Sequence, residues 1–117
     1  AIDGAAEASD GAEADTAVAA GELGDPQQGR KAILQYGCIS CHIIPGIAGR
    51  DVHVGPPLRG IGRRKYIAGV LPNTPENMII WLQSPKAVDP QTAMPDMGVS
   101  QAHARDIAAY LYSLDPR

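Results

Sequence analysis

Apolar residues recur at helical spacing in three segments of this chain, residues 26–36, 75–83 and 101–114. A repeat of three to four positions places these side chains on one face of a helix, which predicts three amphipathic helices. The predicted inward faces consist of Ala32, Ile33 and Tyr36 in the first segment, Met78, Ile79 and Leu82 beside Trp81 in the second, and Ala104, Ile107, Ala108 and Leu111 in the third.

Residues that start and stop helices flank these segments. Asp25 precedes the first segment as an N-cap, with Gln28 placed to close a capping box, and Gly37 follows the last turn. Thr74 and Ser100 occupy the capping positions before the other two segments. The periodic pattern and the local end signals agree, and together they predict an all-α fold.

The segment between the first two predicted helices, residues 43–73, is rich in glycine and proline and shows no strand-like alternation. It predicts loops with one short helical turn near residues 62–68. A loop-rich stretch of this length is unusual in a small compact domain. We therefore expect that something other than side chains fills the centre of the fold.

Charge divides the chain into two parts. Seven of its 13 acidic residues and none of its 10 basic residues fall within residues 1–25, so that part carries −7 and the remainder +4. Residues 1–25 are otherwise mostly Ala and Gly, which predicts a disordered acidic extension, and residues 26–117 form the predicted domain. The chain lacks the dense basic run with interleaved aromatic residues that a nucleic-acid partner would require. No apolar run reaches the ~18–20 residues of a membrane span.

The residues that carry chemistry are Cys38, Cys41 and His42, in the order Cys-Ile-Ser-Cys-His. Cys-x-x-Cys-His is the attachment signature of a c-type haem. Two thiols three positions apart each form a thioether bond to one porphyrin, and the following histidine is placed to bind the iron. The chain has 2 cysteines, so both are used.

Three other interpretations of the two cysteines stay open. A disulfide between them would close a very short loop and add little stability. A thioredoxin-like redox pair would need a βαβ context that the pattern lacks. A zinc site would need a fourth ligand, for which His53 and His103 are the candidates. Covalent haem is the interpretation that we favour.

Several blocks in order resemble the class I monohaem cytochromes c: the helix around Gly29 leading into residues 38–42, then residues 55–58, 93–95 and 109–111. The Ile-Pro-Gly segment at 44–46 resembles the short bacterial type. The resemblance covers residues 25–115 and implies a class I cytochrome c fold, in which three main helices and long loops wrap around one covalently bound haem. It also implies that Gly29 lets the last helix cross closely near Tyr110.

Met94 is the sixth ligand that the resemblance implies. It precedes a proline, and an extended loop of this kind can deliver a thioether to iron. Met97 is the alternative sulfur, whereas Met78 belongs to the apolar face of a predicted helix. His53 and His103 are the candidates for a bis-histidine site, and an open sixth position is the remaining alternative.

The resemblance also implies groups that hold the ligand histidine and the haem propionates. The backbone carbonyl of Pro56 is placed to accept a hydrogen bond from that histidine. The basic residues of segment 59–65 are candidates to pair with the propionates, Arg63 foremost, with Tyr66 and Trp81 as hydrogen-bond donors.

Iron bound on both axial sides has no free position for a substrate and can gain or lose one electron with little rearrangement. The predicted function is therefore one-electron transfer, cycling Fe(II) and Fe(III) between dehydrogenase or terminal-oxidase partners, and not enzymatic catalysis. The chain is predicted to be a monomer that docks transiently. Haem attachment linked to export predicts a periplasmic location, free or tethered to the inner membrane through the extension. The alternatives are a haem module with a labile or absent sixth ligand (a gas sensor or weak peroxidase) and an electron-transfer subunit of a larger complex.

Overall fold

The computed structural model describes residues 23–49 and 55–114. The predicted acidic extension lies almost wholly outside the described residues, as does His53. Its last residues nevertheless belong to the folded unit. Leu23 is buried in the core with 6% of its surface exposed, and Asp25 caps a helix. The packed part of the chain therefore begins before residue 26.

Helix α3, Pro26–Tyr36, has the bounds that its end signals predict. The Asp25 carboxylate accepts a hydrogen bond from the backbone N–H of Gln27 (2.9 Å), and the glycine that follows the helix adopts the left-handed conformation at φ 75°. The predicted capping box with Gln28 is wrong. The backbone N–H of Asp25 donates instead to Asp106 Oδ1 (2.9 Å), which ties the start of α3 to the last helix.

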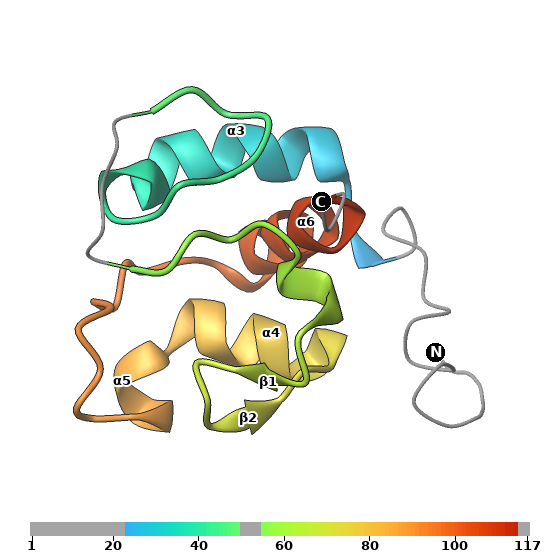
Figure 1. The fold of residues 1–117 in the computed structure, drawn as a ribbon. Helices are drawn as coiled ribbons and strands as arrows, with labels where there is room; N and C mark the ends of the chain where they lie inside the picture. Colours follow the sequence, from blue (N-terminus) through green and yellow to red (C-terminus); the bar gives the residue numbers. More distant parts are fainter. Residues whose placement is uncertain (1–22, 50–54, 115–117) are drawn as a thin grey trace, which may run out of the picture.

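Helix α6, Gln101–Ser113, lies between α3 and the helix α4 described below (Figure 1). Ser100 caps it as predicted, because its hydroxyl accepts a hydrogen bond from the backbone N–H of His103 (3.1 Å). The predicted inner face is confirmed, and the buried residues are Ala104, Ile107, Ala108, Ala109 and Leu111. This helix is the one around which the other elements pack.

Helices α3 and α6 cross at Gly29. A Cβ added at this position would lie 1.9 Å from the backbone oxygen of Asp106, so the predicted close crossing is confirmed. Its partner on α6 is Asp106 and not Tyr110. The Tyr110 hydroxyl instead donates a hydrogen bond to the carbonyl of Pro45 (2.7 Å) and holds the loop that follows the cysteine motif.

Helix α4, Pro75–Gln83, begins at the predicted cap, where the Thr74 hydroxyl accepts a hydrogen bond from the backbone N–H of Asn77 (3.1 Å). Ile79 is only partly buried, so the buried face is turned toward Trp81 relative to the prediction. Its buried residues are Met78, Trp81 and Leu82, which follow the i, i+3, i+4 spacing of one helix face.

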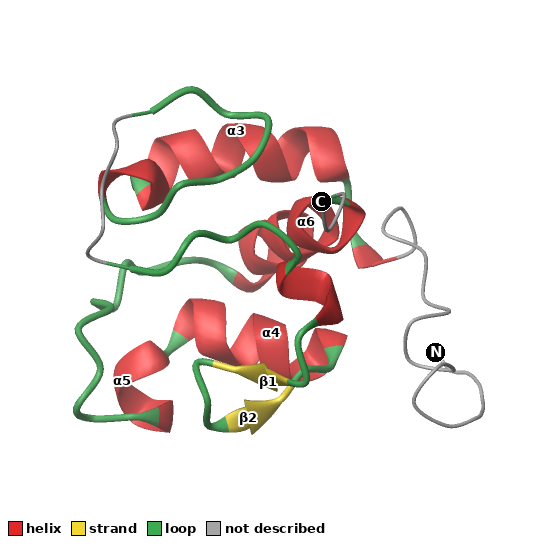
Figure 2. Ribbon diagram, viewed as in Figure 1, coloured by secondary structure: helices red, strands yellow, loops and turns green. Residues whose placement is uncertain are grey.

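Two short elements depart from the predictions. Strands β1 (Tyr66–Ile67) and β2 (Leu71–Pro72) form an antiparallel ribbon in a segment predicted to contain none (Figure 2). Two residues are too few to produce a recognisable alternation. Helix α5 (Pro85–Val88) follows α4 directly, where the sequence predicts only a stop. The helical turn predicted near residues 62–68 is a 3-10 turn (η2) at Ile61–Arg63, which is shorter than predicted and begins one residue earlier.

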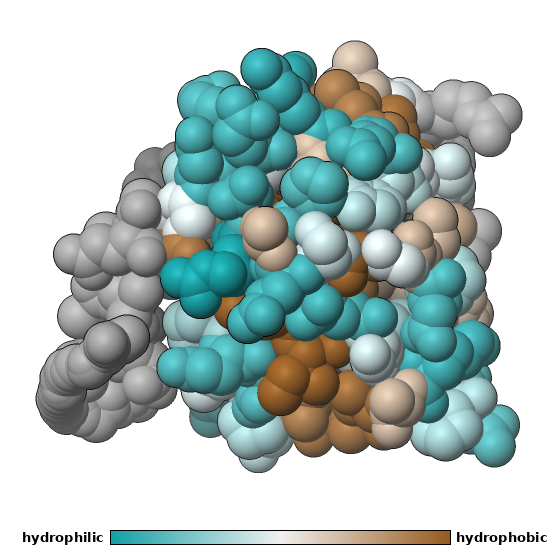
Figure 3. Space-filling view, turned by 180° about the vertical axis from the view of Figure 1, so that it is seen from behind, coloured by the Kyte–Doolittle hydropathy of each residue, from teal (hydrophilic) through white to brown (hydrophobic). Residues whose placement is uncertain are grey.

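The face turned away from the view of Figure 1 is mostly hydrophilic, with apolar side chains gathered low on that face (Figure 3). None of the helices in the described segments has the length and hydropathy needed to traverse a bilayer.

Candidate functional site

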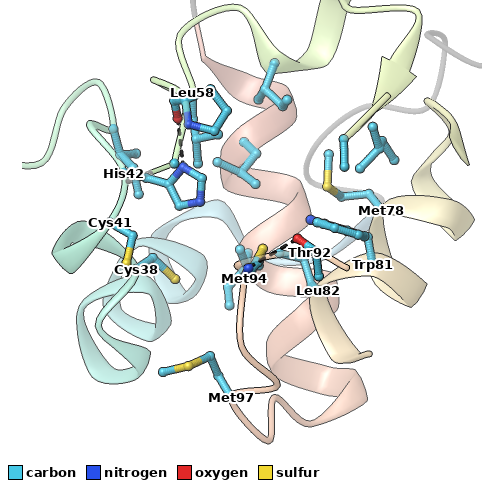
Figure 4. A pocket seen from close by; sticks show the side chains of 18 of the residues that line it. Cys38, Cys41, His42, Leu58, Met78, Trp81, Leu82, Thr92, Met94 and Met97 are labelled. Carbon is cyan, nitrogen blue, oxygen red and sulfur yellow. Dashed lines mark hydrogen bonds between the residues drawn. The ribbon is translucent and has the colours of Figure 1, made fainter. Parts of the chain in front are cut away.

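A cavity of about 770 Å³ lies inside the fold. Helices α3, α4 and α6 and the loops around residues 37–44, 55–58 and 92–97 form its wall (Figure 4). Its volume is within the range of ~300–1,000 Å³ that ligand and cofactor sites occupy. The lining is largely apolar and includes Ile33, Ile67, Met78, Leu82, Ile107 and Leu111. The structure thus contains the space that the loop-rich sequence predicts.

The cysteine motif lies at the end of α3, where the chain enters a 3-10 turn, η1, Cys38–Ser40. The backbone N–H groups of Cys41 (3.2 Å) and His42 (3.0 Å) both donate to the carbonyl of Cys38. This turn brings the two cysteines and the imidazole to the wall of the same cavity (Figure 4). Burial raises the pKa of the Cys38 thiol, a backbone hydrogen bond lowers it, and Cys41 adds to the rise. As a free thiol, Cys38 therefore stays protonated at neutral pH.

A hydrogen bond fixes the imidazole of His42: its Nδ1 lies 2.7 Å from the carbonyl oxygen of Pro56. A carbonyl only accepts, so Nδ1 carries the proton and Nε2 keeps its lone pair for a metal. The strap that supplies this carbonyl, residues 55–58, is held in turn by backbone hydrogen bonds to Cys41 (2.8 Å) and Ile43 (2.9 Å). The orientation of the imidazole is therefore set by the backbone around it.

Gly55 lies against the imidazole, and a Cβ at this position would come within 2.3 Å of His42 Cε1. We expect Gly55→Ala to push the ring away from Pro56, weaken the Nδ1 hydrogen bond and cost about 1–3 kcal/mol of stability. The exchange rate of the Nδ1 proton by NMR and chemical denaturation measure these two effects. Gly49→Ala is the control, because its Cβ would make an ordinary 3.4 Å contact with Ile39. Identical proton exchange in the two variants would contradict the close ring contact.

Two methionines reach the cavity from the loop that precedes α6. Met94 is half-buried, and its backbone N–H donates to the hydroxyl of Thr92 (3.2 Å). Met97 also lines the cavity but has 42% of its surface exposed. Figure 4 shows the Met94 side chain nearer the middle of the cavity than that of Met97. Of the two sulfurs, that of Met94 therefore lies deeper in the cavity, where it would be available to bind a haem iron.

The other candidate ligands lie elsewhere or serve packing. His103 does not line the cavity, and its Nδ1 lies 2.7 Å from the Tyr36 hydroxyl. His53 falls outside the described residues. Met78 lines the cavity from α4 with 2% of its surface exposed, as part of the apolar core.

The groups predicted to hold the propionates differ in whether they line the cavity. Arg63 is exposed and does not line the cavity, whereas Arg64 does, and its guanidinium donates to the carbonyl of Pro57 (2.7 Å). Tyr66 lines the rim with 56% of its surface exposed. Trp81 lines the wall with only 8% exposed, and its indole N–H has no acceptor among residues 23–49 and 55–114. Buried donors in proteins are nearly always paired, so this N–H points to a bound group.

Sequence reasoning does not single out two residues of the site, although both belong to segments that it names. Nothing in the basic segment 59–65 ranks Arg64 above Arg63, because the path of the loop decides which guanidinium faces the cavity. Gly55 reads only as part of a stiff Gly-Pro-Pro turn. Its signal was its place directly before Pro56, since a residue next to the carbonyl that holds a ring must leave room for that ring.

The residues around the cavity fit a covalently held haem. Cys38 and Cys41 are not joined in a disulfide, and both are at the cavity beside an imidazole whose Nε2 is free to bind iron. Across the part of the chain that the structure describes, no group of three or more His, Cys, Asp or Glu residues is placed to hold a metal ion. A haem bound here would supply reversible one-electron chemistry in an apolar surrounding.

Comparison with known proteins agrees with this fit. The family model for cytochrome c matches residues 26–115. A cytochrome c oxidase subunit 2 from Alkalihalophilus pseudofirmus is 33% identical over 88 residues, which are 74% of this chain and 25% of the relative. The chain thus spans about a quarter of the length of that curated relative.

Two solved structures are also similar. Cytochrome c2 from Rhodobacter sphaeroides matches with a TM-score of 0.62 and 28% identity, over 80% of this chain and 98% of that one. Cytochrome c2 from Rhodobacter capsulatus matches with a TM-score of 0.51 and 24% identity, over 77% and 97%, and supports the fold alone. The chain belongs to the cytochrome c family: it has the class I fold, carries a covalent c-type haem and acts in haem-based electron transfer.

Proposed function

We propose that this protein is a one-electron carrier whose haem iron is held by His42 and Met94 and which delivers electrons to a terminal oxidase. The observation that carries the ligation is the placement of both side chains on the wall of one apolar cavity, from segments more than fifty positions apart. The similarity to an oxidase subunit 2 supports the choice of acceptor.

The proposed ligand set suits a carrier better than an enzyme. Two protein ligands leave no coordination position for a substrate, and the iron changes oxidation state with little movement. A thioether ligand and an apolar lining both raise the reduction potential relative to a bis-histidine site. The cysteines would hold the haem at η1, the Pro56 carbonyl would orient His42, and Arg64, Tyr66 and Trp81 would meet the propionates.

The remaining proposals concern context. Residues 26–117 would form the haem domain, and residues 1–25 would serve as an acidic linker or tether. We place the protein in the periplasm, because haem attachment to this motif resembles an export-linked process. An electron-transfer part of a larger oxidase or dehydrogenase assembly is the second form of the same function, supported by the fraction of the oxidase subunit that the chain matches.

Oxygen uptake by a purified cytochrome c oxidase, with ascorbate as reductant, tests the proposed function. We expect the rate of oxygen uptake to rise with added protein and then to saturate. The absorption spectrum of the ferrous protein should not change when carbon monoxide is added. Ready carbon monoxide binding without stimulation of oxygen uptake would instead support a sensor or weak peroxidase with a labile sixth ligand. The mass of polypeptide plus one haem after denaturation checks the covalent attachment in the same sample.

A further inference from the structure

Tyr36 and His103 form a hydrogen-bonded pair beside the cavity. The Tyr36 hydroxyl lies 2.7 Å from His103 Nδ1, and the two rings meet edge to face, with centroids 5.4 Å apart and 71° between their planes. Tyr36 lines the cavity from the last turn of α3, whereas His103 lies behind it in the first turn of α6. The pair joins a titratable imidazole to the wall of the redox site.

The imidazole can make this bond in two ways. Neutral His103 accepts the phenol proton at Nδ1, whereas protonated His103 donates from Nδ1 and the phenol oxygen accepts. In the second state the Tyr36 O–H must rotate away. Proton binding therefore adds a positive charge and reverses the direction of a hydroxyl dipole at the cavity wall.

The two helices that carry the pair, and the loop before α6, also hold charged side chains. Asp106, one turn further along α6, accepts from the backbone at the start of α3 (2.9 Å). Arg30 donates to a loop carbonyl (3.2 Å), and Asp96 accepts a backbone N–H of α5 (3.2 Å). Lys31 and Arg105 are exposed to solvent. In the described residues, none of these charged groups is hydrogen-bonded to the His103 imidazole, whose partner is the Tyr36 hydroxyl.

We propose that His103 is a proton-binding site coupled to the haem through Tyr36, so that the protein releases a proton when it gives up an electron. The electron passes to the redox partner, and the proton leaves His103 Nδ1 for solvent, so atoms and charge balance. Ferric haem carries one more positive charge than ferrous haem and opposes a nearby imidazolium. The proposal goes beyond the carrier function and does not depend on whether Met94 or Met97 is the sixth ligand.

The coupling has a definite sign. Proton binding that is weakened by oxidation must, by linkage, favour the reduced haem. The reduction potential is therefore highest when His103 is protonated, and it falls with rising pH as the imidazole loses its proton. Once the imidazole is neutral in both oxidation states, the contribution of the pair is constant.

An NMR titration of the His103 ring protons in the ferrous and ferric holoprotein tests the coupling directly. We expect the ferric form to titrate at lower pH than the ferrous form. The same midpoint in both forms would overturn the proposal. Because this measurement uses the unaltered protein, it does not require any variant to fold.

Variants assign the effect to the pair. We expect His103→Gln to flatten the fall of the reduction potential with pH and Tyr36→Phe to bring the two His103 titrations closer together. Lys31→Gln is the matched control, because it removes an exposed charged group from the helix that carries Tyr36, and it should leave the slope of the curve unchanged. A slope lost in Lys31→Gln, or kept in His103→Gln, would show that another group couples the proton.

Discussion

We expect Met94→Ala to lower the reduction potential by at least ~0.1 V, within the range of ~0.8 V that axial ligands span in haem proteins. A thioether favours the ferrous state, so its loss favours the ferric one. The vacated position also becomes open to external ligands. Potentiometric titration measures the first effect. Carbon monoxide binding by the ferrous variant, together with loss of the long-wavelength ferric band of a methionine-ligated haem, measures the second.

Met97→Ala separates ligation from the general effect of removing a methionine from this loop. Both side chains line the cavity, but Met97 has 42% of its surface in solvent. We expect its removal to leave the reduction potential and the ferric band unchanged. If Met97→Ala lost the band and Met94→Ala kept it, Met97 would be the ligand. If both variants kept it, the sixth ligand would not be a sulfur from this loop.

The elements that the sequence predicts well are those whose signals lie within a few residues. Asp25, Thr74 and Ser100 cap the three main helices because each oxygen accepts from a backbone N–H two or three positions ahead. The heptad-like recurrence of Ala104, Ile107 and Leu111 depends only on helix geometry. Local chemistry thus decides where these helices begin and which face they bury.

The elements that the sequence does not predict depend on distant contacts. The Asp25 N–H could be satisfied by Gln28 in an isolated helix, but in the fold it donates to Asp106, 81 positions away. Asn73, which directly follows β2, links the ribbon to the preceding loop, because its side chain donates hydrogen bonds to the carbonyls of Ile61 and Arg64 (both 2.8 Å). Such bonds become visible only once the chain is folded.

The residues of the candidate site also differ in whether they depend on local signals or on distant contacts. Cys38, Cys41 and His42 are recognisable because one turn of chain must present all three to a single porphyrin, which fixes their spacing. The contribution of Arg64 has no such local constraint. It requires the loop of residues 57–64 to close back on itself, where the guanidinium meets the carbonyl of Pro57. Chemistry that fits into one turn can be predicted, and chemistry assembled by a loop requires the structure.

Gly29→Ala is expected to destabilise the protein by about 3 kcal/mol, at the upper end of the usual cost of overpacking. The added Cβ would lie 1.9 Å from the backbone oxygen of Asp106 and 2.5 Å from its carbonyl carbon, so α3 must move away from α6. Alanine gains at most ~1 kcal/mol over glycine from helix propensity, which does not offset the loss of contact along the crossing. For a domain of this size the midpoint of thermal unfolding should fall by roughly 10–20 °C.

Lys31→Ala provides the matched control on α3. Its side chain is exposed on the same helix, and substitutions of this kind usually change stability by less than ~0.5 kcal/mol. The comparison distinguishes a packing constraint from a preference for glycine in this helix. A Gly29→Ala protein that was more stable than the original would mean that the helices are farther apart than the structure places them. Because the crossing holds α6 against the cavity, we expect the destabilised variant to lose its haem-site rigidity as well, which faster exchange of the His42 Nδ1 proton would report.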